Sequence, residues 1–248
     1  MLLCIISKTF EMNRKPEVTA GIFLMLTGFS VTITILTDVK FLTALSFISE
    51  DIKYISENTR LLYINSLLWT NSALLIIISA AALIAAIIPH QSFLGYLQGF
   101  FLFLAAGMFC FSGVKGLAIN ELLKNYHELD PINSDSLKSN ILTLSKEKDI
   151  YLIIGYNLTG LYFFVIGIFS YITLKIPVFT GILASLTGIL ISLFTLFFPE
   201  SIFRDIGLIM TCFMFFILSV RFIFTGLERK QRNTNKKKNN SGRVDYTI

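Results

Sequence analysis

Six long apolar segments constrain the fold of this chain more than any other feature of its sequence. A helix rises about 1.5 Å per residue, so about 20 apolar residues cross a hydrocarbon layer of about 30 Å. The segments predict spans at residues 18–39, 61–88, 93–119, 151–174, 177–198 and 206–226. The sequence therefore predicts an all-α, polytopic integral membrane protein. Its one domain, residues 1–226, is a bundle of six transmembrane helices.

The composition excludes the soluble alternatives. Hydrophobic residues make up 54% of the 248-residue chain and charged residues 15%, whereas a soluble domain has about 25% charged residues. One water-surrounded core of this size has no room for 24 phenylalanine side chains as well as the other apolar residues. The high share of hydrophobic residues also excludes a disordered or fibrous chain.

The residues of common catalytic and metal sites are scarce. The two histidines, His90 and His127, lie in separate connections, which excludes a site with several imidazoles. Cys4, Cys110 and Cys212 are far apart and indicate neither a disulfide framework nor a zinc site. The chain also lacks a glycine-rich phosphate-binding loop that ends in Gly-Lys-Ser/Thr. We therefore expect no cofactor, no metal and no enzymatic activity.

The prolines lie near the predicted span boundaries. Pro16 precedes the first span, Pro89 follows the second, and Pro177 and Pro199 flank the fifth. Pro131 falls in the polar connection between the third and fourth spans. Because proline lacks an amide hydrogen, it favours helix ends. No proline interrupts a span, which argues against the broken helices of many transporter sites.

Two longer connections have the spacing of amphipathic helices. Apolar residues share one helix face at Phe41, Leu45, Ile48, Ile52 and Ile55. This predicts a helix on the membrane surface, with an irregular loop as the alternative. In the connection over residues 121–150, a second short amphipathic helix is expected around Leu137, Ile141 and Leu144.

Charge near the span ends predicts the orientation. Arg14 and Lys15 directly precede the first span, and a basic tail over residues 227–248 directly follows the last. Its basic residues are Arg229, Lys230, Arg232, Lys236, Lys237, Lys238 and Arg243. Since basic residues at span ends favour the cytoplasm, both termini are predicted to be cytoplasmic, in a plasma membrane.

The composition of residues 227–248 predicts a disordered tail. Its function is either to orient the last span or to bind anionic lipid headgroups. The positive net charge comes mainly from this tail, so we expect no nucleic-acid partner.

Five polar residues within or near the spans are candidates for functional contacts. Arg221 and Lys115 lie close to span ends, where long side chains reach the headgroups; the alternative for Arg221 is an anion contact inside the bundle. Gln98, Asn71 and Asn157 are expected to bond to neighbouring helices, with substrate contacts as the alternative.

Small residues recur along two of the spans. They are Gly95, Gly99 and Gly107 in the third span, and Gly181, Ser185 and Gly188 in the fifth. Small side chains let helix backbones approach closely. The pattern predicts tight packing inside the bundle and leaves a homodimer face open.

Several stretches resemble the domain-of-unknown-function 4386 family of prokaryotic six-span membrane proteins. They are TAGIFLMLTG, LLWTNSALLIIISAAALIAAIIP, GYLQGFFLF, KIPVFTGILASLTG and FIFTGLE. Residues 97–100 (LQGF) depart from the Arg-Ile-Ile-Glu-like stretch that this family has at the start of its third span. The resemblance implies a six-helix bundle and no reaction.

Three functions are compatible with these features. The first is a non-enzymatic, multi-pass membrane protein that packs with lipid or with a partner membrane protein. The second is a small transporter or channel with a polar path between the third, fourth and sixth spans, which Gln98, Asn157 and Arg221 would line. The third is a membrane-embedded enzyme. The absence of acidic residues from the middle of every span favours the first.

Overall fold

The computed structural model describes residues 16–45, 59–87, 93–126, 131–173, 177–198 and 202–241. These form α2 (Pro16–Leu45), α4 (Thr59–Ile87), α5 (Phe93–Tyr126), α6 (Pro131–Thr173), α7 (Val178–Phe197) and α8 (Ile202–Ser241). All six helices are long and apolar enough to cross a membrane. The prediction of an all-α, six-span integral membrane protein is confirmed.

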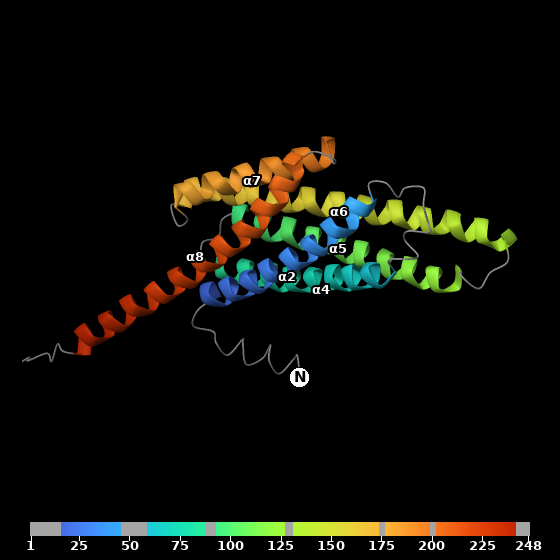
Figure 1. Ribbon diagram of the computed structural model, residues 1–248. Helices are drawn as coiled ribbons and strands as arrows, with labels where there is room; N and C mark the ends of the chain where they lie inside the picture. Colours follow the sequence, from blue (N-terminus) through green and yellow to red (C-terminus); the bar gives the residue numbers. More distant parts are fainter. Residues whose placement is uncertain are drawn as a thin grey trace, which may run out of the picture.

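The helices form a closed ring in chain order. Each packs on its neighbours in the chain, and α8 returns to pack on α2; the contact between α7 and α8 is the smallest of the ring. Successive helices are antiparallel, so the start of α2 and the long end of α8 lie at the same end of the bundle (Figure 1). The side chain of Val18 fills the space beside Gly226. This end, where α2 begins and α8 continues beyond the bundle, is called the terminal end below.

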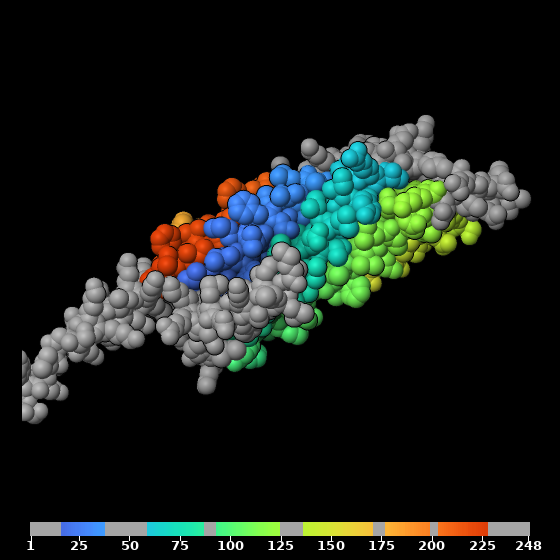
Figure 2. Space-filling view, turned by 90° about the horizontal axis from the view of Figure 1, so that it is seen from below, coloured from blue at the N-terminus to red at the C-terminus, as the bar shows by residue number. Residues whose placement is uncertain are grey.

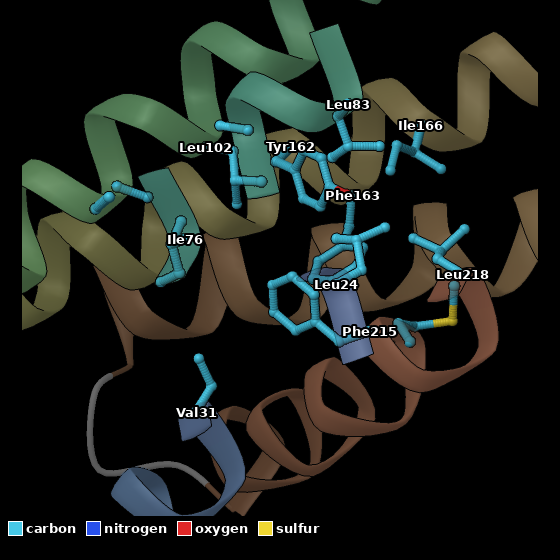
Figure 3. Packing of buried hydrophobic residues seen from close by; sticks show 14 of the residues in the cluster. Leu24, Val31, Ile76, Leu83, Leu102, Tyr162, Phe163, Ile166, Phe215 and Leu218 are labelled. Carbon is cyan, nitrogen blue, oxygen red and sulfur yellow. The ribbon is translucent and has the colours of Figure 1, made fainter. Parts of the chain in front are cut away.

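The centre of the ring is filled by large apolar side chains. All six helices contribute to this core, α7 through Ala184 and Ile191. Figure 3 labels Leu24 and Val31 of α2, Ile76 and Leu83 of α4, Leu102 of α5, Tyr162, Phe163 and Ile166 of α6, and Phe215 and Leu218 of α8. In lipid, the hydrophobic effect contributes little to the association of helices. Interdigitated packing of this kind therefore holds them together.

The hairpin of α5 and α6 extends beyond the rest of the bundle at the end opposite the termini (Figure 1). With 43 residues, α6 is about 64 Å long at about 1.5 Å per residue, twice the hydrocarbon thickness. A second, smaller core joins the base of this hairpin to α4. It contains Leu62, Ile119, Leu123 and Ile141.

The structure corrects the prediction for the connection over residues 121–150. The amphipathic segment around Ile141 and Leu144 is helical, but it is the first part of α6 and not a separate surface helix. Pro131 begins α6 instead of lying in a loop. Proline suits a first helical position, since its φ is already helical and it needs no amide donor there. The hydropathy falls where α6 leaves the lipid, so the sequence pattern did not reveal that the same helix extends into the polar connection.

The last helix also differs from the prediction. We expected residues 227–248 to be unfolded, yet α8 continues to Ser241. No glycine or proline interrupts residues 227–241, and Arg, Lys and Gln have good helix propensity. Residues 242–248 lie outside the described part of the chain. So do Ile48, Ile52 and Ile55 of the predicted surface helix, whereas Phe41 and Leu45 belong to α2.

Candidate functional site

A layer of buried polar side chains separates the large central core from the small core at the hairpin base. We call Ser66, Ser112, Asn120 and Lys148 the polar layer. Lys148 is only 2% exposed, although it carries an ammonium group. Gly116 makes room for this layer: a β-carbon there would clash with Ser66 Oγ and lie 3.4 Å from Lys148 Cε. The layer therefore joins α4, α5 and α6.

An aromatic group closes the layer on the side of the central core. The Trp69 ring stacks on Phe109 with centroids 4.7 Å apart, and Tyr156 meets it edge-on at 5.7 Å. Because α4 and α5 are antiparallel and Ser66 faces Gly116, Trp69 and Ser112 lie at similar depth, about one turn further in. Among the described residues, neither Trp69 Nε1 nor Ser112 Oγ has a hydrogen-bond partner.

An ion pair lies at the accessible edge of the layer. Lys115 Nζ of α5 is 2.6 Å from Glu147 Oε2 of α6, and both side chains are partly exposed. Lys115, for which the sequence predicts an interfacial position, therefore pairs across the α5–α6 contact. An exposed pair of this kind contributes about 0–1 kcal/mol to stability.

The layer combines hydrogen-bond donors and acceptors. Lys148 donates, as does the neighbouring Trp69 N–H, whereas the Ser66 and Ser112 hydroxyls and the Asn120 amide can both donate and accept. A mixed set of this kind suits ordered water. No group of three His, Cys, Asp or Glu side chains in the described ranges lies close enough to hold a metal ion.

A ladder of buried side-chain hydrogen bonds joins α2 to α4. Its contacts are Thr27 Oγ1 to Ser79 Oγ at 2.7 Å, Ser30 Oγ to Ser72 Oγ at 2.7 Å, Thr34 Oγ1 to Ser72 Oγ at 2.9 Å, and Asn65 Nδ2 to Thr37 Oγ1 at 3.2 Å. Such contacts hold membrane helices at about 0.6–2 kcal/mol each. Sequence reasoning missed the ladder, although its α4 members recur every seven residues.

Two of the three residues expected to line a polar path, Gln98 and Asn157, do not meet. Asn157 Nδ2 donates to Ser192 O at 3.1 Å and to Ser192 Oγ at 3.0 Å, so it faces α7. Gln98 is buried in α5, and its Nε2 has no partner among the described residues. Phe109 of α5 packs on Gly155 of α6, which fixes the relative depth of these two antiparallel helices. In this alignment Asn157 lies further into the bundle than Gln98, by about nine residues or about 14 Å. Arg221 is partly exposed on α8.

Aromatic rings occupy the space where α6 approaches α8. The Phe215 ring of α8 lies 5.2 Å from the Phe163 ring and 6.3 Å from the Tyr162 ring, measured between centroids. All three side chains are at most 1% exposed. The remaining predicted polar residue, Asn71, is exposed on the outer face of α4.

The small residues of α7 lie against α6. A β-carbon on Gly188 would come within 2.5 Å of Gly160 O, and Ser185 occupies the space beside Gly167. Gly181 likewise lies against Ser170 of α6. In α5 the positions differ: Gly99 lies against Ile84 of α4, Gly95 is buried, and Gly107 has open space around it. Most of this pattern serves contacts within the bundle.

Together the fold and the polar layer define a multi-pass helical membrane protein whose six helices surround a filled centre. No protein-family model, no curated protein and no solved structure matches the chain.

Proposed function

We propose that this protein works by binding lipid and a partner membrane protein, and that it is not an enzyme. The observation that carries the proposal is the filled centre of the ring, where Leu102, Tyr162, Phe163 and Phe215 are almost completely buried. A transporter needs a polar or water-filled route through the bundle. The difference in depth between Gln98 and Asn157, and the contact of Asn157 with α7, give a path between the third, fourth and sixth spans little support.

The proposed setting is a prokaryotic plasma membrane with both termini in the cytoplasm. In the sequence, Arg14 and Lys15 directly precede α2, and the basic residues of α8 directly follow its apolar part. The resemblance to the domain-of-unknown-function 4386 family supports this setting, and we propose a distant relationship to it.

The basic part of α8 is the proposed lipid contact. Arg229, Lys230 and Arg232 follow the apolar part of the helix within a few residues of Leu227, at about headgroup depth. Each basic residue near an anionic surface contributes about 1 kcal/mol. Three such charges would therefore contribute about 3 kcal/mol to the binding of anionic lipid.

Native mass spectrometry of the full chain tests this contact. The protein is released from micelles that contain equal amounts of phosphatidylglycerol and phosphatidylethanolamine. Replacing Arg229, Lys230 and Arg232 with Gln should weaken phosphatidylglycerol retention by up to about 100-fold, which corresponds to about 3 kcal/mol for three charges. Phosphatidylethanolamine retention should stay unchanged.

A charge-matched variant provides the control. Lys124, Lys138 and Lys146 are exposed on the α5–α6 hairpin, so their replacement with Gln changes the net charge by the same amount at the opposite end. This control should retain phosphatidylglycerol like the unaltered chain. Equal retention by all three proteins would show that α8 does not bind anionic lipid.

A further inference from the structure

An amide faces the lipid in the middle of α4. Asn71 lies near the midpoint of Thr59–Ile87 and is exposed, whereas Trp69, two residues earlier, is completely buried. Two residues turn a helix by about 200°, so Asn71 points away from the core. Its side chain has no hydrogen-bond partner among the described residues. Hydrocarbon offers no partner either, so this amide favours contact with another protein surface.

The surroundings of Asn71 on this face form a regular seam. The α4 seam consists of Ile64, Leu67, Asn71, Leu74, Ile78, Ala81 and Ala85. The steps between them alternate between three and four residues along the whole helix. All are exposed except Ile78, which is partly exposed. Figure 2 looks onto this side of the bundle, where α4 is at the surface between α2 and α5.

Alternation of three and four is the spacing of one face of any helix, and it lets the side chains of two facing helices interlock. The polar Asn71 at the middle distinguishes this face from the apolar outer face of α2, which has the same spacing. A single amide in such a seam fixes the register and the number of helices. Near the terminal end, Ala81 and Ala85 are small enough for two backbones to approach closely. The α4 seam thus has an apolar contact strip, one polar position and a narrow end.

We propose that the chain forms a two-fold homodimer through the α4 seam, with Asn71 of each copy bonded to the same residue of the other. All copies insert in the same direction, so a two-fold axis along the membrane normal makes the two α4 helices parallel and in register. An amide both donates and accepts, so it is complementary to itself. The inference rests on the proposed function, since it names the partner as a second copy.

Cysteine cross-linking in native membranes tests the dimer geometry. In a chain with Cys4, Cys110 and Cys212 replaced by Ser, Leu74→Cys places a thiol on the seam beside Asn71. Phe213→Cys places an equally lipid-exposed thiol on α8. Oxidation should link most Leu74→Cys chains into dimers and leave Phe213→Cys chains monomeric.

Energy transfer between labelled copies in vesicles tests the amide. Asn71→Leu should weaken dimerisation by about 3- to 20-fold, the range expected for an interhelical hydrogen bond in a membrane. Its unfolding in detergent should remain unchanged, because the side chain lies outside the core.

Three results would overturn the dimer: Leu74→Cys cross-linking no better than Phe213→Cys, cross-linking of Leu74→Cys to a different protein, or unaltered dimerisation of Asn71→Leu. Lipid retention in the mass-spectrometry experiment does not depend on Asn71. Failure of the dimer is therefore distinguishable from failure of the proposed lipid contact.

Discussion

Replacing Gly188 with Ala should lower the free energy of unfolding by about 3 kcal/mol, the upper part of the range for overpacking. The added β-carbon would lie 2.5 Å from Gly160 O and 2.6 Å from the amide nitrogen of Phe164. Both are backbone atoms of α6, which cannot move aside without separating the two helices. Equilibrium unfolding in mixed micelles with increasing dodecyl sulfate measures the change.

Gly107→Ala is the matched control. No atom lies within 4 Å of the position that a β-carbon on Gly107 would take. This substitution should raise the free energy of unfolding by about 0.5–1 kcal/mol, because Ala is the better helix former. Equal destabilisation by the two substitutions would contradict the close backbone contact between α6 and α7.

Replacing Phe215 with Ala should lower the free energy of unfolding by about 3–5 kcal/mol, as measured in the same micelles. The Phe215 ring joins α8 to Tyr162 and Phe163 of α6 in the centre of the ring (Figure 3). Its removal leaves a cavity there, and the lining side chains lose their packing contacts.

Phe213, two residues earlier in α8, is 63% exposed and provides the comparison. Lipid replaces the lost contacts when Phe213 is changed to Ala, so the change in unfolding free energy should stay within about 0.5 kcal/mol. If Phe215→Ala lowered the free energy of unfolding as little as Phe213→Ala, the centre of the bundle would not be packed as the structure has it.

The spans were predictable because the bilayer sets both their length and their composition. Where a polar connection follows at once, the predicted limits agree closely with the helices: residues 177–198 were expected, and α7 is Val178–Phe197. Where a helix continues into water the limits fail, since hydropathy reports the lipid boundary and not the helix end. Both α6 and α8 show this.

The polar contacts were much less predictable, because they depend on which helices become neighbours. Lys148 belongs to the apolar face of Ile141 and Leu152, at steps of seven and four residues, and this spacing was its only signal in the sequence. Asn157 was expected to contact a neighbouring helix, and only the fold identifies that helix as α7. The outward direction of Asn71 likewise could be assigned only once the order of the helices in the ring was known.

Water access to the middle of the bundle tests the central claim most directly. In the cysteine-free chain, Leu102→Cys places a thiol in the filled centre, and Lys138→Cys places one on the exposed hairpin. In sealed vesicles, a membrane-impermeant maleimide should leave Leu102→Cys unmodified from either side and should modify Lys138→Cys from one side. Rapid modification of Leu102→Cys would mean that water reaches the centre, and would contradict a protein whose six helices enclose a dry core.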